Sequence, residues 1–467
     1  MKENTFSQGV GRAPFTRELP LFEHRAVHLD LKGLPPTPER LLLFLDLCAA
    51  ARYNAVLVEW EDMFPWTVDE RFRCETAYTS AEVDAFVKKA ARLGIELIPL
   101  VQCLGHMETP LRLPDYAALR EVPGNADVLN PLAPGARDLV LRMVEDVLER
   151  MPAATYFHLG GDEAWTYGTH PDTKAFIEQH GKGALYMQHV EPILDRLLAR
   201  GIRPILWHDM MTGWEDAALI ALKEKADLCV WGYGQDPRVT RHHSSVVHIR
   251  RFHQLGLSMW AGSAYKGADG VDSDLPLLPN RLANMKAWAE VGEEFRMKGM
   301  VMTAWSRYST DQVQTEPMDG ALDLFFLGGL LAHDGEIPKD RDAAVRTLLR
   351  QTGEEARFTA CREVLAKISV ERTAGWANAR MLREYLITAE EDPKRACSGH
   401  AGKHLEHLVR HADTLEQLRP AFLAAFTSLT PEIWLQRYFN ERYLSLRAES
   451  DELARRMNEQ PFPFSPG

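Results

Sequence analysis

Two acidic residues stand side by side where an apolar run ends in two glycines. The stretch TYFHLGGDEAW covers residues 155–165 and places Asp162 next to Glu163. Neighbouring side chains of a regular strand point to opposite faces, but Gly160 and Gly161 permit backbone angles that are closed to other residues. Both carboxylates can then face one pocket. Two close carboxylates do not ionise equally easily, so one can stay a protonated acid while the other stays anionic.

Tryptophans recur beside polar side chains along the same part of the chain. Six of the eleven tryptophans fall at or just past the ends of apolar runs: Trp60, Trp165, Trp207, Trp231, Trp260 and Trp305. Sugars present C–H faces that stack on aromatic rings and hydroxyls that need hydrogen bonds. The set therefore favours a carbohydrate pocket, although core packing is an equal alternative for any single tryptophan.

Eight apolar runs alternate with amphipathic helical patterns from residue 25 to about residue 335. The runs are 25–31, 54–60, 95–101, 155–160, 203–209, 227–233, 257–263 and 299–305. Most are almost continuously apolar, as in strands that are buried on both faces of a parallel sheet. The count predicts an α/β fold, a (β/α)8 TIM barrel, whose active site lies at the C-terminal ends of the strands. An open doubly wound sheet is the alternative, but no nucleotide-binding glycine pattern follows an early strand.

This position decides between two interpretations of the acidic pair. Acidic residues at the start of a helix also interact favourably with the helix dipole, so Asp162 and Glu163 could be surface acids. At the end of a barrel strand, after a double-glycine break, we expect them to be catalytic.

The pattern of the 467-residue chain changes after the last apolar run, because long charged helical stretches replace the strands. We expect an N-terminal extension at 1–20, a catalytic barrel at 21–336, an all-α C-terminal domain at 337–460 and a tail at 461–467. The C-terminal helices either pack on their own barrel or form a homodimer, and the sequence does not decide between the two.

Composition excludes several classes of partner. The net charge of −12 gives no basic field for nucleic acid or anionic membranes, and the basic run at 241–253 is expected to be a solvated helix face. The six cysteines are scattered without a CxxC pair, which favours a reducing compartment. No apolar leader and no run of about 18 apolar residues is present. We therefore expect a cytoplasmic protein that binds neither membranes nor nucleic acid.

The stretch HLGGDEAW resembles the H-x-G-G-D-E signature of the family-20 glycoside hydrolases, the β-N-acetylhexosaminidases. Further stretches are similar to the hexosaminidase D subgroup: VHLDLKG (27–33), EWEDMFPW (59–66), LVQCLGHME (100–108), LWHDM (206–210), WAGSAYKGAD (260–269) and TAWSRYS (303–309). The resemblance implies an exo-acting enzyme that removes terminal β-linked N-acetylgalactosamine or N-acetylglucosamine by a retaining, substrate-assisted mechanism with an oxazolinium-like intermediate. It implies no cofactor and no metal.

Residue roles follow from this resemblance position by position. Asp162 is expected to orient the acetamido N–H, and Glu163 to protonate the leaving oxygen and then to activate water. Tyr265 is expected to donate a hydrogen bond to the acetamido oxygen. The other matched positions are His106 and the pocket walls Trp207, Trp231 and Trp305.

Three positions depart from the family pattern. Gly33 stands where secreted members carry an arginine for O3 and O4, Gln102 replaces an aspartate, and Arg307 replaces a glutamate. We therefore expect a rebuilt hydroxyl-binding end, and the resemblance to hexosaminidase D implies tolerance of, or preference for, galactosamine-type sugars. Its expected residues are Glu61, Asp209, Lys266 and Arg307.

Two other functions stay open at this point. A metal-dependent, amidohydrolase-like barrel hydrolase would use strand-end ligands, here His28, Asp30, His106, His158, His208 and Asp209, although its usual H-x-H is H-x-D here. A carbohydrate-binding barrel without catalysis is the third hypothesis, and the presence of both Asp162 and Glu163 argues against it.

Overall fold

The computed structural model describes residues 15–234, 236–306, 314–392 and 400–459. Eight parallel strands close into a barrel in the order β1-β10-β9-β8-β7-β6-β3-β2. The strands are β1 His24–Asp30, β2 Ala55–Glu59, β3 Glu96–Leu100, β6 Tyr156–His158, β7 Arg203–Trp207, β8 Asp227–Trp231, β9 Met259–Lys266 and β10 Gly299–Ala304. Each corresponds to one predicted apolar run, so the predicted (β/α)8 barrel is confirmed.

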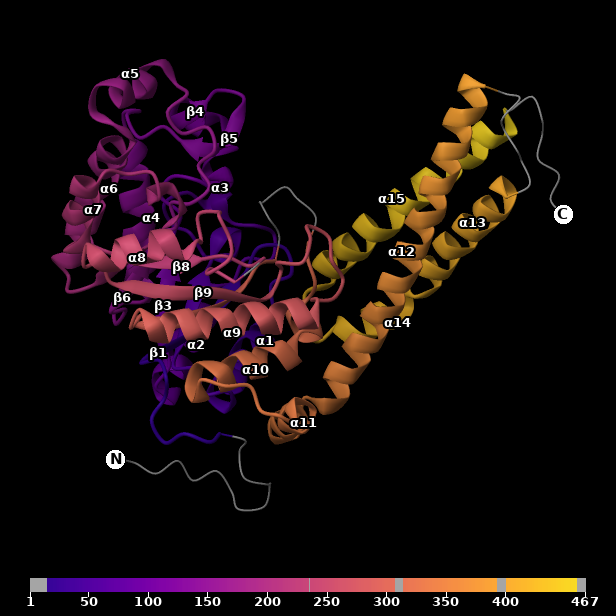
Figure 1. Cartoon of the computed structure of the whole chain (residues 1–467), viewed down its shortest axis with the longest axis horizontal. Coiled ribbons are helices and arrows are strands. Elements are labelled where there is room, and N and C mark those ends of the chain that lie inside the picture. The colour runs from indigo at the N-terminus through magenta and orange to yellow at the C-terminus, as the bar shows by residue number, and fades with distance from the viewer. Residues whose placement is uncertain (1–14, 235, 307–313, 393–399, 460–467) are drawn as a thin grey trace.

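Helices cover the outside of the barrel (Figure 1). They are α1 Pro38–Ala50, α2 Ser80–Leu93, α4 Ala136–Arg150, α5 Pro171–His180, α6 Lys182–Leu198, α7 Asp216–Lys223, α8 Val246–Gln254, α9 Leu278–Glu294 and α10 Leu322–Asp334. Local sequence sets their ends. In α2, Thr79 and Glu82 form a reciprocal capping box, and Gly94 ends the helix in the left-handed region.

The connection between β3 and α4 contains elements that the strand pattern did not predict. The short helix α3 Glu108–Leu111 is followed by an antiparallel hairpin of β4 Arg120–Val122 and β5 Asn125–Leu129. Glu121 of this hairpin accepts hydrogen bonds from the backbone amides of Gly168, Thr169 and His170, just past the acidic pair. The hairpin therefore fixes the loop that follows β6.

Alternate residues of each strand point into the barrel, where a small core fills the interior. This core contains Ala26, Ala55, Leu57, Ile98, Leu100, Ile205, Trp207, Cys229, Trp260 and Val301. The other residues of each strand face the helices and belong to the larger core. Within a strand, this period of two decides whether a side chain faces the barrel interior or the helices.

The C-terminal region is helical, as predicted, and consists of α11 Arg341–Thr352, α12 Glu355–Glu391, α13 Ala401–Gln417, α14 Arg419–Phe426 and α15 Glu432–Asn458. Helix α11 joins the barrel core through Val345 and Leu348, whereas α12 to α15 share a second core. Helices α12, α13 and α15 lie side by side and project from the barrel as an arm (Figure 1). The predicted domain boundaries stay predictions.

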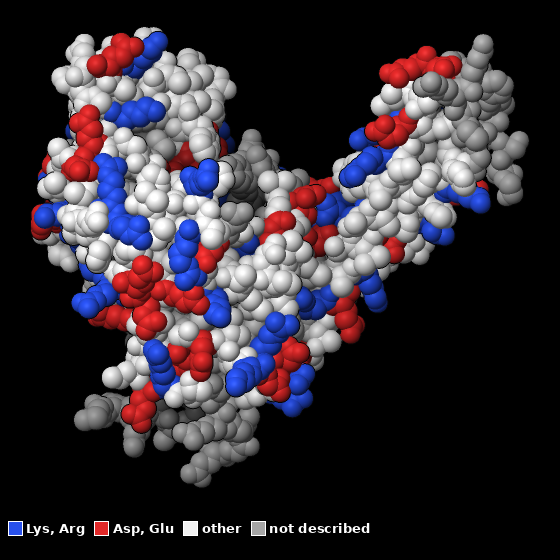
Figure 2. Space-filling model, viewed as in Figure 1, with Lys and Arg blue, Asp and Glu red and all other residues white. Residues whose placement is uncertain are grey.

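The surface carries charges of both signs. On the face drawn in Figure 2, acidic and basic side chains are interspersed over the barrel and the arm. None of the helices in the described part of the chain has the length and apolar character needed to cross a bilayer.

Candidate active site

A pocket of about 250 Å³ lies at the C-terminal ends of the barrel strands. Its lining comes from the loops after β3, β6, β8, β9 and β10. The lining residues are His106, Asp162, Glu163, Trp231, Tyr233, Gly267, Ala268, Gly270, Val271, Trp305 and Thr315. Five of these residues were singled out from the sequence, namely His106, Asp162, Glu163, Trp231 and Trp305.

The double-glycine break has the geometry that the sequence suggested. Gly160 and Gly161 have φ angles of +58° and +80°, and Glu163 itself adopts a φ of +46°. A Cβ atom on Gly160 would lie 1.8 Å from Gln102 Oε1, and one on Gly161 would lie 2.2 Å from Tyr186 Oη. Neither position therefore has room for a side chain, and the turn brings both carboxylates to the pocket.

His106 lies between the two carboxylates. Its Nε2 atom is 3.7 Å from Asp162 Oδ2 and 3.5 Å from Glu163 Oε2. Burial opposes protonation of the ring, but the charges and hydrogen bonds of Asp162 and Glu163 outweigh it and raise the pKa of His106 well above its usual range. An imidazolium at this position compensates for the negative charge of the pair.

Asp209 lies beside the acidic pair and accepts a hydrogen bond from the backbone of Glu163. It lies at the start of the 3-10 helix Asp209–Met211 after β7, and its Oδ2 accepts a hydrogen bond of 3.0 Å from the amide of Glu163. Its Oδ1 accepts a bond of 3.1 Å from the indole of Trp231. Burial and the nearby Asp162 raise the pKa of Asp209 to about 7. Asp209 is not among the described residues of the pocket lining, so these two contacts give it a role in positioning Glu163 and Trp231, and its contact with sugar hydroxyls stays a prediction.

Tyr265 does not reach the pocket, contrary to the expectation from sequence. Strand β9 continues to Lys266, so Tyr265 lies inside the strand with outward parity. Its ring packs on Phe325 of α10, with ring centroids 5.8 Å apart, and only 1% of the residue is exposed. The apolar run that predicts this strand ends at residue 263, so Tyr265 was expected in the loop that follows it.

The tyrosine that lines the pocket is Tyr233. It has the inward parity of Cys229 and Trp231 on β8, and its ring stacks on Trp231 at a centroid distance of 5.2 Å. Its buried hydroxyl makes no hydrogen bond of normal geometry within the described chain, although the side chains of Thr303 and Trp305 lie beside it. The signal for Tyr233 was present in the sequence as the alternating run Cys229, Trp231, Tyr233.

Three of the six strand-end tryptophans belong to the site. Trp231 and Trp305 line the pocket, and Trp207 lies beneath it, with its ring centroid 5.9 Å from that of Trp305. The other three lie elsewhere. Trp60 packs outward on Phe64 and Phe86, Trp260 stacks on His24 at the opposite end of the barrel, and Trp165 is 71% exposed.

Several buried polar atoms of the inward rows around the pocket have no hydrogen-bond partner within the described chain. They are Asp162 Oδ1, Trp207 Nε1, Tyr233 Oη, Thr303 Oγ1 and Trp305 Nε1. Buried polar groups are nearly always hydrogen-bonded, so unsatisfied donors and an unsatisfied acceptor at one place indicate a polar ligand.

The residues expected to bind sugar hydroxyls do not lie together at one end of the pocket. Glu61 lies near His106, and its Oε2 accepts a 2.9 Å hydrogen bond from Thr109. Lys266 is buried and donates to the backbone carbonyl of Trp305 at 2.6 Å, so it holds the pocket wall rather than a sugar. Arg307 lies outside the described residues.

A buried ionic cluster that sequence analysis did not foresee lies behind Trp305. The ammonium group of Lys32 is 2.6 Å from Glu59 and 3.2 Å from Asp30, and it lies 5.7 Å from the ring centroid of Trp305. Glu59 also accepts a hydrogen bond of 3.2 Å from Gln102, whose Oε1 accepts from the amide of Gly161. The cluster thereby supports the double-glycine turn.

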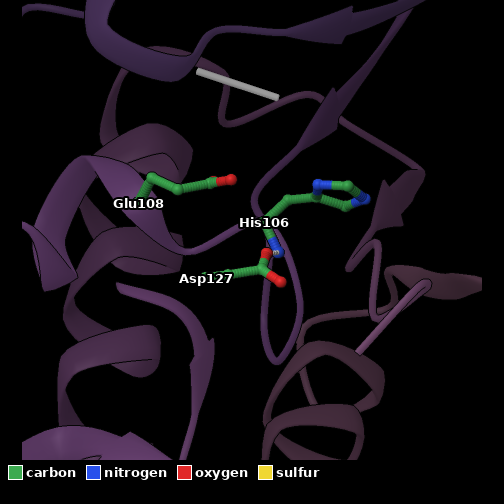
Figure 3. Close-up of side chains that lie close together, drawn as sticks. All are labelled: His106, Glu108 and Asp127. Atoms are coloured by element: carbon green, nitrogen blue, oxygen red, sulfur yellow. Dashed lines mark hydrogen bonds between the residues drawn. The ribbon is translucent and has the colours of Figure 1, made fainter. Parts of the chain in front are cut away.

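His106 also faces two further acidic side chains. Figure 3 shows Glu108 and Asp127 pointing toward His106, and the ligand atoms of the three lie within 4.8 Å of one another. His106, Asp162 and Glu163 form the other group of this kind in the described ranges. Either set offers one nitrogen and two carboxylate oxygens, which a divalent cation could bind.

The strand-end histidines of the metal hypothesis have partners of their own. His28 pairs with Glu59 at 3.1 Å, His158 Nδ1 accepts from the amide of Gly160 at 2.9 Å, and His208 Nε2 bonds the carbonyl of His243 at 3.0 Å. These contacts do not bring the proposed ligands together, so the geometry does not favour the amidohydrolase-like alternative.

Comparisons with known proteins agree with one another. Residues 22–319 match the family model described as "Glycosyl hydrolase family 20, catalytic domain". The protein named Hexosaminidase D from Bos taurus is 33% identical over 303 residues, which are 62% of this chain and 87% of that protein. Hexosaminidase D from Homo sapiens is 32% identical over 339 residues, which are 70% of this chain and 69% of that protein.

Solved structures support the fold. A chitobiase from Flavobacterium johnsoniae has a TM-score of 0.56 at 12% identity and covers 95% of this chain and 73% of its own. An N-acetyl-β-hexosaminidase from Streptomyces plicatus has a TM-score of 0.52 at 17% identity and covers 72% of this chain and 69% of its own.

Proposed function

The chain belongs to glycosyl hydrolase family 20 and is a hexosaminidase of that family, and we propose that it is an exo-enzyme for terminal β-linked N-acetylgalactosamine or N-acetylglucosamine. The family retains anomeric configuration through substrate-assisted catalysis, in which the 2-acetamido group of the substrate is the nucleophile. The proposal concerns the sugar and the role of each residue.

The observation that carries the proposal is the match between the unsatisfied polar atoms and an acetamido group. Such a group presents one N–H donor and one carbonyl acceptor on a small apolar methyl. Asp162 Oδ1 is an acceptor without a partner in the described chain, and Tyr233 Oη is a hydroxyl without one. Trp231 and Trp305 supply aromatic walls for the methyl group and the sugar ring.

The chemistry follows from these contacts. The acetamido oxygen attacks the anomeric carbon while Asp162 accepts the acetamido N–H and Tyr233 donates to the oxygen. Glu163 gives its proton to the departing glycosidic oxygen as that C–O bond breaks. Water then attacks the same carbon as its bond to the acetamido oxygen breaks, and transfers a proton to Glu163, which restores both the acid and the acetamido group. Two inversions give net retention, and general acid help of this kind is typically worth ~10²–10⁴-fold in rate.

Pocket size supports action on a terminal sugar. The cavity of about 250 Å³ is smaller than the roughly 300–1,000 Å³ of a typical ligand cleft, so it suits one sugar ring rather than an extended chain.

Three further parts of the proposal rest on sequence. Tolerance of, or preference for, galactosamine-type sugars follows from the resemblance to hexosaminidase D. A cytoplasmic location agrees with five free cysteines in the described ranges. A homodimer through the C-terminal helices stays a prediction.

The experiment that tests the proposal measures nitrophenol release from four β-glycosides: the N-acetylgalactosaminide, the N-acetylglucosaminide, the galactoside and the glucoside. Hydrolysis of the first two alone is expected, and their ratio reports the C4 preference. The variant Glu163→Gln is the control that assigns the activity to this pocket, because it should lose orders of magnitude in kcat. Equal hydrolysis of the plain sugars would refute the substrate-assisted mechanism.

A further inference from the structure

One wall of the pocket consists of two loops that lie beside the C-terminal helices. Gly267, Ala268, Gly270 and Val271 belong to the connection between β9 and α9, and Thr315 belongs to the connection between β10 and α10. These five residues are nearly half of the described lining residues but have no part in the acid–base chemistry proposed above.

The two loops are joined to each other by Glu316. Its Oε1 accepts a hydrogen bond of 2.7 Å from the amide of Gly267, and its Oε2 accepts one of 2.6 Å from the hydroxyl of Ser273. The Thr315 hydroxyl donates to the carbonyl of Trp305 at 2.6 Å. Because Glu316 is fully buried, the loops and the Trp305 backbone form one connected wall.

Helix α15 holds this wall through Arg442. The guanidinium group is 1% exposed and donates from Nε to Asp274 Oδ1 at 2.5 Å. From Nη2 it donates to the carbonyls of Gln314 at 2.7 Å and Ser273 at 3.1 Å. A single planar side chain of the C-terminal region thus bonds both loops at once.

Two neighbours fix Asp274 in the same arrangement. The hydroxyl of Tyr438 on α15 donates to Asp274 Oδ1 at 3.2 Å, and Arg372 on α12 donates to Oδ2 at 2.7 Å. The Arg442 guanidinium also lies 3.4 Å from the ring centroid of Tyr438. The contacts come from both long helices of the arm, so the arm and the pocket wall are mechanically coupled.

We propose that Arg442 is a positioning residue of the active site, through which the C-terminal helices hold the pocket wall formed by Gly267–Val271 and Thr315. The inference rests on the proposed function, since it assigns to this wall the binding of the sugar or its leaving group. Asp162 and Glu163 lie outside these contacts. The wall touches the substrate in the ground state and the transition state alike, so its displacement affects KM more than kcat.

The test compares the wild type with Arg442→Lys, which keeps the charge but cannot make the Nε and Nη2 bonds together. We expect KM for the best nitrophenyl N-acetylhexosaminide to rise roughly tenfold or more while kcat stays within about threefold. Tryptophan fluorescence should show the same loss in the affinity for free N-acetylgalactosamine and N-acetylglucosamine, because Trp231 and Trp305 line the pocket.

The matched control is Arg419→Lys. Arg419 begins α14 and bonds Glu416 at 2.8 Å and Asn440 at 2.8 Å, all within the C-terminal helices. A loss of Tm with wild-type KM is expected for this control. An unchanged KM for Arg442→Lys would overturn the inference, and so would an equal rise in KM for both variants, because the effect would then be general destabilisation.

Two further arms keep the outcome decisive. If Arg442→Lys does not fold, Tyr438→Phe is the alternative variant, because it removes only one hydrogen bond to Asp274. It should also raise KM, by a smaller factor, and an unchanged KM overturns the inference.

The proposed function fails separately, if the wild-type enzyme hydrolyses no acetamido sugar. In that case, sugar binding by wild type and Arg442→Lys still decides the role of Arg442, and equal affinity, including no affinity in either, overturns it.

Discussion

His106 and Asp209 determine how the two acidic residues of the pocket behave. His106 lies 3.7 Å from Asp162 and 3.5 Å from Glu163, and the charges and hydrogen bonds of these carboxylates raise its pKa well above its usual range and favour the charged imidazolium. Asp209 holds the Glu163 amide and the Trp231 indole with its two oxygens. The pair is thus held in position by one neighbour and compensated electrostatically by the other.

Tyr233 lines the pocket whereas Tyr265 packs against α10, so substitutions at the two tyrosines should have different effects on activity. Tyr233→Phe removes the one tyrosine hydroxyl among the described lining residues, so kcat/KM for an N-acetylhexosaminide should fall roughly 10–100-fold, the effect of one transition-state hydrogen bond. Tyr265→Phe should leave kcat/KM unchanged, because this side chain packs against α10. Steady-state kinetics of both variants check this. The reverse order of effects would return the substrate-binding role to Tyr265.

Glu61 should make stability depend on pH. Burial, with Glu59 and Glu108 nearby, raises its pKa from 4.5 to about 8 despite the opposing charge of Lys32. The folded state therefore binds a proton that the unfolded state has lost, and the free energy of unfolding falls as pH rises from about 4.5 to about 8.

The variant Glu61→Gln cannot ionise but keeps an oxygen for the Thr109 hydroxyl. The free energy of unfolding of this variant, relative to wild type, should increase by roughly 1–2 kcal/mol between pH 5 and pH 8. The full pKa shift would give more, at ~1.4 kcal/mol per pKa unit, but Glu61 is partly exposed and solvent weakens the effect. Urea unfolding at several pH values measures this. Parallel pH profiles for the two proteins would contradict the assignment.

At the scale of elements, the barrel could be predicted because its signal is local. Each buried strand is a short apolar run, and the run boundaries agree with the strands to within a few residues. The parity of side chains past the strand ends was harder to predict, since it depends on where each strand stops. Strand β9 extends to Lys266, and this difference of three residues turned Tyr265 away from the pocket. The hairpin β4–β5 was missed because its strands are short and partly exposed.

The turn after β6 should tolerate no side chain. In Gly160→Ala, the added Cβ would lie 1.8 Å from Gln102 Oε1, and Gln102 cannot easily move because it bonds Glu59 and the amide of Gly161. We expect the turn to shift by about 1 Å and activity to fall by about 10²-fold or more.

Gly94→Ala is the control, since Gly94 also has a positive φ of +67° but open space around its Cβ position. It should lose only ~1–2 kcal/mol of stability from backbone strain and keep its activity. Activity assays with thermal unfolding test both variants. Full activity in Gly160→Ala would show that the turn does not position the acidic pair.

The whole molecule joins a barrel to a helical arm through polar contacts that are invisible to pattern analysis. Helical periodicity predicted α12 to α15, but it could not reveal that α11 joins the barrel core or that Arg442 reaches the pocket loops. Such contacts link residues that are more than 100 positions apart. They arise only when the chain has folded, so no local pattern carries them.

Arg40 should stabilise the packing of the C-terminal helices against the barrel. It lies on α1 and is 1% exposed, with one nitrogen bonded to Asp319 before α10 and another 3.0 Å from Glu354 at the start of α12. Arg40→Met removes the charge and leaves the buried carboxylate of Asp319 without its ion-pair partner, while Glu354 keeps only Arg357 at 2.6 Å. The expected loss in the free energy of unfolding is about 3–5 kcal/mol, because an uncompensated buried charge is far more costly than a lost surface pair.

The matched control for Arg40 is Arg71, whose side chain is 52% exposed and pairs with the exposed Asp115 and with Asp69, which also accepts a hydrogen bond from Tyr116. Arg71→Met should leave Tm unchanged within error, since solvent screens the charges of an exposed pair. Denaturant unfolding of the two variants at one ionic strength measures the difference. Similar small losses in both would mean that Asp319 and Glu354 gain solvent or protons once Arg40 is gone, and that the barrel and the arm do not depend on this cluster for their association.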